Sequence, residues 1–129
     1  MKVAYIAGPY RGETILDILE NIREAEKWAL VYWKKGYAVI CPHKNSALFD
    51  GQAHDDVWLQ GDLELLKRSD LIVMIPGWQL SEGALAEFNF ARGHGINIEY
   101  AGPDLETAGM TVDEAKEYFC QKDDPREPT

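Results

Sequence analysis

The stretch "DLIVMIPGWQLSEGALAEFNFARGHGINIEY", residues 70–100, decides the fold. It opens with a continuous apolar run over 70–75, which is typical of a strand with both faces covered. Ser81 is a good N-cap, and Gly93 and Gly95 supply a stop, so the spacing predicts a helix between them. "INIEY", residues 96–100, predicts a second strand. A strand, a helix and a strand in this order predict two parallel strands joined by a crossover helix.

The rest of the chain continues this alternation of strands and helices. Hydrophobic spacing predicts further helices over 14–35 and 57–68 and further strands over 2–7 and 37–41. The capping box "TVDE" predicts a short helix over 111–119, and a charged, Pro-containing tail follows over 121–129. We therefore expect one α/β domain over residues 1–120. Its core would be a single doubly wound (Rossmann- or flavodoxin-like) parallel sheet of four to five strands with helices on both faces.

Composition narrows the class of protein and its partners. The chain has 129 residues, of which 46% are hydrophobic and 27% charged, as expected for a soluble globular domain. No apolar run approaches the ~20 residues of a membrane span, and the N-terminal run is too short for a signal peptide. The two cysteines have neither metal-ligand nor redox spacing, which favours a reduced, cytoplasmic protein. A net charge of −9 disfavours nucleic-acid polymers, whereas one Arg and a helix N-terminus can still bind a small anion.

Ligands of doubly wound domains bind at the carboxyl ends of the strands. Three segments fall on that rim, namely "GPYRG" (8–12), "CPHKN" (41–45) and "PGWQLSEGALAE" (76–87). In the first, Gly8 and Gly12 permit close backbone approach, and Arg11 offers donors suited to phosphate. The glycine spacing fits neither a Walker A loop nor a dinucleotide fingerprint, and a simple tight turn is the alternative.

The third segment holds a carboxylate in an unusual place. At about 100° per residue, Ala84, Leu85, Phe88 and Ala91 form the apolar stripe of the predicted helix. Glu87 falls at the edge of this stripe, beneath Gly83, which offers no side chain, while Glu82 falls on the polar side. A half-buried carboxylate is costly unless it is paired or used, so Glu87 is a candidate catalytic residue. The alternative is a glutamate that reaches solvent or pairs with a Lys or Arg.

Other rim residues allow two interpretations each. We expect His43 and Asn45 to contact a base or sugar, with loop capping as the alternative. Trp78 precedes the helix of Glu87 and is placed to stack on a base, or simply to pack. His43, His54, Asp55 and Asp56 lack the spacing of metal ligands, so we expect no metal and no cofactor.

Four motifs in order give a family resemblance that covers about residues 3–100. "YIAGPYRG", then a helix and "GYAVICPH", then "GDLELLKRSDLIVM", then Ser81-x-Gly83-x-x-x-Glu87 resembles the nucleoside 2-deoxyribosyltransferase superfamily. That superfamily includes the deoxynucleoside 5′-monophosphate N-glycosidases.

The resemblance implies a role for each matching position. Glu87 matches the nucleophile that attacks the anomeric carbon, Tyr5 a tyrosine that holds this glutamate, and Asp62 an aspartate that contacts substrate and assists departure of the base. The loop of Gly8, Pro9 and Arg11 matches the surroundings of the sugar-phosphate, and Ser81 and Gly83 match the helix N-terminus. The chemistry is consistent, because an oxocarbenium-like sugar is stabilised or captured by a neighbouring carboxylate.

Ser81 and Arg11 favour a 5′-monophosphate substrate over a free nucleoside. Transferases of free nucleosides tend to carry Asp where Ser81 stands, and a second Asp would repel a phosphate that a Ser at a helix N-terminus attracts. The leading prediction is thus an N-glycosidase of (deoxy)nucleoside 5′-monophosphates. The alternatives are a deoxyribosyltransferase and a non-catalytic nucleotide-binding module. The resemblance and the aromatic side chains of Trp28, Tyr32 and Trp33 also predict a homo-oligomer, with a dimer the simplest form.

Overall fold

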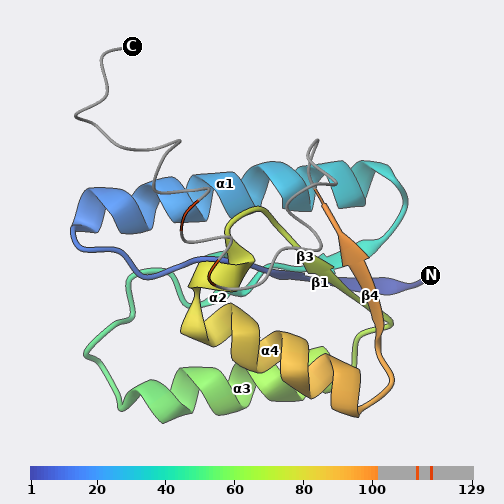
Figure 1. Ribbon diagram of the computed structural model, residues 1–129. Helices are drawn as coiled ribbons and strands as arrows, with labels where there is room; N and C mark the ends of the chain where they lie inside the picture. Colours follow the sequence, from blue (N-terminus) through green and yellow to red (C-terminus); the bar gives the residue numbers. More distant parts are fainter. Residues whose placement is uncertain (102–112, 114–116, 118–129) are drawn as a thin grey trace.

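The computed structural model describes residues 1–101 together with Asp113 and Glu117, both of which are helical. Strands and helices alternate along the chain (Figure 1). In order they are β1 (Val3–Ala7), α1 (Ile15–Lys34), β2 (Ala38–Ile40), α2 (Pro42–Asn45), α3 (Asp55–Lys67), β3 (Leu71–Met74), the 3₁₀ turn η1 (Trp78–Leu80), α4 (Glu82–Gly93) and β4 (Asn97–Tyr100).

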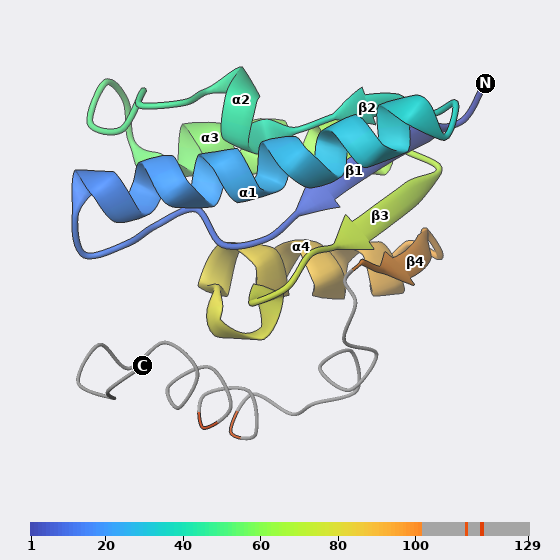
Figure 2. The same ribbon diagram turned by 90° about the horizontal axis from the view of Figure 1, so that it is seen from above.

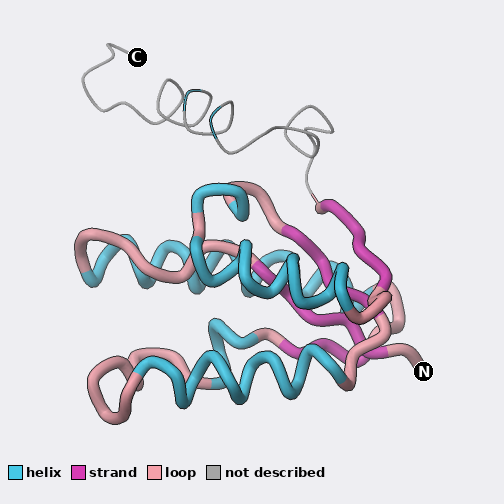
Figure 3. Tube along the Cα trace, turned by 60° about the horizontal axis from the view of Figure 1, so that its bottom comes forward, coloured by secondary structure: helices cyan, strands magenta, loops and turns pink. Residues whose placement is uncertain are grey.

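The four strands form one parallel sheet in the order β2-β1-β3-β4. Helix α1 covers one face of the sheet, and α3 and α4 cover the other (Figures 1 and 3). Seen from above, β1 and β3 point to the edge at which the loop after β1 and the N-terminus of α4 lie (Figure 2). The predicted doubly wound α/β fold is confirmed, with four strands among the described residues.

Alternation along β1 sends neighbouring side chains into two separate cores. Ala4 and Ile6 pack under α1, while Tyr5 and Ala7 pack under α3 and α4. All four are fully buried. Tyr5 therefore lies on the same face of the sheet as α4, which carries Glu87.

The aromatic residues of α1 have different environments. Tyr32 is buried and its hydroxyl donates to Glu99 of β4 at 2.7 Å, and Trp28 packs against the same core. Trp33 is 54% exposed. Of the three aromatic residues taken as a sign of a homo-oligomer, Tyr32 and Trp28 pack in the core and Trp33 faces solvent.

One short helix lies where the sequence analysis predicted none. The fixed φ of Pro42 suits the first turn of a helix, and Pro42–Asn45 forms the short α2 directly after β2. The helix predicted over 111–119 lies outside the described residues except for Asp113 and Glu117, as does the tail over 121–129, and the domain boundary at residue 120 stays a prediction. No helix among the described residues is long and apolar enough to cross a membrane.

Candidate active site

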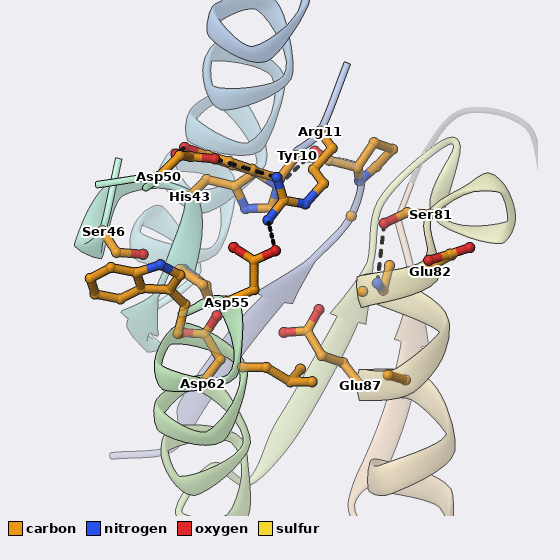
Figure 4. Close-up of a pocket in the computed structure, with 18 of the residues that line it drawn as sticks. Tyr10, Arg11, His43, Ser46, Asp50, Asp55, Asp62, Ser81, Glu82 and Glu87 are labelled. Carbon is orange, nitrogen blue, oxygen red and sulfur yellow. Dashed lines mark hydrogen bonds and ion pairs between the residues drawn. The ribbon is translucent and has the colours of Figure 1, made fainter. Parts of the chain in front are cut away.

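A cavity of about 750 Å³ opens at the carboxyl edge of the sheet. The chain leaves β1 and β3 there in opposite directions, toward β2 and toward β4. Such a switch point is where open α/β sheets bind their ligands. The loop after β1, helix α2, the first turns of α3 and the N-terminus of α4 form the walls (Figure 4). The volume is that of a site for a small organic ligand.

Glu87 lies at the base of this cavity. It is only 8% exposed, and the Tyr5 hydroxyl donates a hydrogen bond to its Oε2 atom. Gly83, one turn earlier on α4, keeps the space above it open, since a Cβ at Gly83 would meet nothing nearer than the Ser81 hydroxyl at 3.9 Å. Glu82 is exposed at the rim. The described structure therefore holds Glu87 inside the protein with a neutral partner, and neither Lys nor Arg is paired with it.

Burial makes Glu87 a weak acid. Desolvation raises its pKa to about 8, and the negative charge of Asp62 adds to this, while the hydrogen bond from Tyr5 acts in the opposite direction. The pKa of the Tyr5 hydroxyl is raised far above its ordinary value by burial and by the Glu87 and Asp62 carboxylates, so Tyr5 remains a proton donor. Tyr5 thus orients Glu87 without competing with it for charge.

Asp62 projects from α3 into the same cavity (Figure 4). It is half-buried, and desolvation raises its pKa to about 6. Two carboxyl groups with different raised pKa values share one proton over the interval between those values. Around neutral pH the pair of Glu87 and Asp62 can therefore present one carboxylate and one acid.

The loop after β1 approaches the sheet closely. A Cβ at Gly8 would lie 2.2 Å from Ile75 Cγ1, so only glycine fits there. The Pro9 carbonyl accepts a hydrogen bond from His43 Nε2 at 2.8 Å. His43 is buried, and desolvation lowers its pKa, so its ring is neutral and protonated at Nε2. His43 consequently holds the loop and also lines the cavity, and its Nδ1 atom has no partner in the described part of the chain.

Arg11 lines the cavity but is not free. Its guanidinium contacts Asp55 Oδ2 at 3.1 Å and Asp50 Oδ2 at 3.6 Å. The sequence suggested a phosphate ligand for Arg11 and did not reveal these two aspartates, which come from the loop before α3 and from its first turn. Any anion that binds Arg11 competes with them.

The N-terminus of α4 has the predicted cap. Ser81 Oγ accepts from the Ala84 N–H at 3.1 Å, which leaves the N–H groups of the first two helical residues directed out of the helix at the cavity wall. Ser81 and Gly83 both line the cavity.

Two residues expected to touch a ligand are placed elsewhere. Asn45 is exposed at the end of α2 and does not line the cavity. Trp78 is buried in the core beneath α4, where its ring lies 4.8 Å from that of Phe88 and 6.0 Å from that of Tyr100. The base or sugar contact expected of Asn45 does not fit a residue outside the cavity lining. The base stacking expected of Trp78 does not fit either, because η1 turns its side chain back onto the core.

The structure adds lining residues that the sequence analysis did not single out. These include Tyr10, Ser46 and Trp58. Trp58 lies one turn before Asp62 on α3, and its ring packs against Phe49 with centroids 5.7 Å apart. The i, i+4 spacing of Trp58 and Asp62 was the available signal, since it places both on one helix face.

These observations define an α/β protein of the doubly wound class with a paired-carboxylate cavity at its switch point. The chain belongs to the family described as domain of unknown function (DUF4406), whose model matches residues 1–100. No curated protein matches the chain in sequence.

Solved structures share the fold. The 2-deoxyribosyltransferase from the psychrotolerant bacterium Bacillus psychrosaccharolyticus is 22% identical with a TM-score of 0.57, over 76% of this chain and 70% of that one. A conserved protein from Enterococcus faecalis V583 is 21% identical with a TM-score of 0.55, over 95% of this chain and 76% of that one. At such identities the likeness establishes the fold.

Proposed function

We propose that the protein cleaves the N-glycosidic bond of a (deoxy)nucleoside 5′-monophosphate and releases the free base and the sugar 5-phosphate. One observation carries the proposal: Glu87 is buried at the base of a ligand-sized cavity, is oriented by Tyr5, and faces the same space as Asp62. The fold shared with a 2-deoxyribosyltransferase supports chemistry at the base–sugar bond.

The proposed reaction uses the two carboxyl groups in turn. Because Glu87 is the weaker acid, the active form is the minor one of the singly protonated pair, in which Asp62 holds the shared proton. Glu87 attacks the anomeric carbon while the carbon–nitrogen bond breaks, and Asp62 gives its proton to the departing base. This leaves a glycosyl ester on Glu87 and a carboxylate at Asp62. Water then attacks the anomeric carbon, Asp62 takes the proton of the water, and Glu87 is released as a carboxylate, which restores the starting protonation.

Phosphate recognition is assigned to the loop after β1 and to the start of α4. Arg11 supplies the positive charge, and the first residues of α4, with their free N–H groups, line the cavity beside the Ser81 hydroxyl. This part of the proposal rests on Arg11 exchanging a present carboxylate partner for the phosphate.

The transferase alternative differs only in the acceptor. If a second base rather than water attacks the glycosyl ester, the same residues transfer deoxyribose between bases. The named structural neighbour favours keeping this alternative. A module that binds nucleotides without turnover has no need of a buried, oriented carboxylate.

A substrate panel separates these functions. We expect the purified protein to release base from one or more nucleoside 5′-monophosphates, detected by chromatography, and to act more slowly on the matching nucleosides. Base exchange that outpaces hydrolysis when a second base is added would identify a transferase. Binding without base release from any substrate would contradict the enzyme proposal.

We also propose that the protein is a homodimer that uses α1. Six large apolar side chains of this helix are exposed: Ile15, Leu16, Leu19, Leu30, Val31 and Trp33. We expect light scattering at micromolar concentration to give twice the mass of the chain, and Trp33→Glu to shift the protein toward monomer by introducing a charge at the contact. Lys34→Glu, an exposed neighbour on the same helix, is the control. A wild-type protein that is monomeric would refute this proposal.

A further inference from the structure

Six acidic side chains line the cavity, against one arginine. They are Asp50, Asp55, Asp56, Asp62, Glu82 and Glu87. These negative charges repel a dianionic phosphate that enters the cavity. The affinity for the phosphate therefore depends on how the carboxylates next to Arg11 hold its guanidinium.

Asp50 and Asp55 hold Arg11 in different ways. Asp50 is tied to the protein, because its Oδ1 atom accepts a hydrogen bond from the Tyr10 hydroxyl at 2.7 Å, and that hydroxyl in turn accepts from the Leu48 N–H at 3.0 Å. Asp55 is the first residue of α3, makes the closer contact with Arg11, and is 66% exposed. Its carboxylate can turn into water at little cost, since a solvent-exposed ion pair contributes little to stability.

We propose that Asp55 determines selectivity at the phosphate end of the cavity: it holds the Arg11 guanidinium, and a 5′-phosphate must take that guanidinium from it. The inference rests on the proposed function, because it concerns the 5′ end of the same substrate. Asp50 remains on Arg11 and on Tyr10 during this exchange and keeps the loop in place. A ligand without a 5′ charge leaves the Arg11–Asp55 pair intact.

The chain offers a matched control. Asp56 follows Asp55 in the first turn of α3, is similarly exposed, and carries the same charge near the same helix end. It contacts His54 Nδ1 at 3.3 Å rather than Arg11. Asp55→Asn and Asp56→Asn therefore change the net charge and the helix terminus alike, but only the first removes a partner of Arg11.

The test measures binding and turnover with paired ligands. For Asp55→Asn we expect the Kd and KM of a nucleoside 5′-monophosphate to fall about five-fold, because Arg11 no longer has to leave its closer carboxylate partner. The values for the matching nucleoside should stay within about two-fold of the wild type. Asp56→Asn removes a similarly exposed and therefore largely screened charge without freeing Arg11, so it should change the ratio of the two ligands by less than about two-fold. At higher salt concentration, the difference in monophosphate Kd between Asp55→Asn and the wild type should become smaller.

The double variant Arg11→Gln/Asp55→Asn tests whether Asp55 acts through Arg11. In the Arg11→Gln background, Asp55→Asn should change monophosphate binding by less than about two-fold, because the exchanged partner is gone. The inference is overturned if Asp55→Asn weakens monophosphate binding, tightens nucleoside binding equally, or behaves as Asp56→Asn does. Calorimetry measures binding without turnover and so tests the role of Asp55 separately from the proposed function. If Asp55→Asn binds the monophosphate more tightly but not the nucleoside, and no base is released from either, the glycosidase proposal is refuted and the role of Asp55 stands.

Discussion

Glu87→Gln is expected to reduce turnover by about 10³-fold or more while substrate binding persists. The substitution keeps the shape of the side chain and an oxygen that can accept the hydrogen bond from Tyr5. It removes the nucleophile and the negative charge beside the anomeric carbon, so covalent and electrostatic stabilisation of the transition state are lost together. Single-turnover base release and calorimetric titration measure the two quantities on the same protein.

Glu82→Gln is the matched control for this substitution. Glu82 lies on the same helix but is exposed at the rim, so the amide there should leave turnover within a few-fold of the wild type. A fully active Glu87→Gln protein would return Glu87 to a structural role and remove the glycosidase proposal with it.

Glu87→Gln is also expected to change how the free energy of unfolding depends on pH. The pKa of Glu87 is about 8 in the folded protein against an ordinary 4.5, so the folded state binds this proton more tightly than the unfolded state between those pH values. The free energy of unfolding of the wild type therefore loses a contribution as pH rises from about 4.5 through about 8. Glutamine does not ionise and avoids the loss. Thermal unfolding should show Glu87→Gln to be more stable than the wild type at about pH 8, with the gain shrinking toward about pH 4.5.

The chain's periodicity predicted the fold and the position of Glu87, while Tyr5 and Asp62 were singled out by the family resemblance. Helical spacing placed Glu87 at the edge of an apolar stripe, and the structure buries it there. The parallel sheet brings Tyr5, 82 residues away in sequence, onto the same face. Apolar spacing along α4 determines the position of Glu87, and the alternation of β1 within the parallel sheet determines that of Tyr5.

The partners of Arg11 and the direction of Trp78 could not be predicted in this way. Arg11 meets Asp50 and Asp55 only because the loop after α2 folds back over the loop after β1, with Tyr10 joining the two. Trp78 turns into the core because η1 reverses the chain just before α4. Both depend on the path of irregular segments, for which hydrophobic periodicity carries no information.

Asp62→Asn is expected to lower kcat/KM by about 10²- to 10⁴-fold and to change the shape of its pH dependence. In the wild type, the pKa values of about 6 at Asp62 and about 8 at Glu87 predict a bell-shaped profile, because the active pair holds one proton. Below about pH 6 both groups are protonated and the nucleophile is lost. Above about pH 8 both are ionised and the departing base finds no acid.

An asparagine at position 62 removes both the acid and the negative charge that raises the pKa of Glu87. The descending limb should therefore disappear, and the remaining activity should rise to a plateau with a midpoint below about pH 8, as expected for a single carboxylate that must ionise. Steady-state rates between about pH 5 and about pH 9 with one monophosphate substrate test this. Because a residue that only supports the fold would scale the whole curve, an unchanged bell at lower amplitude would exclude Asp62 as the proton donor. If only the alkaline limb disappears, Asp62 is the acid that protonates the departing base, and Glu87 is the carboxylate that must be ionised to attack.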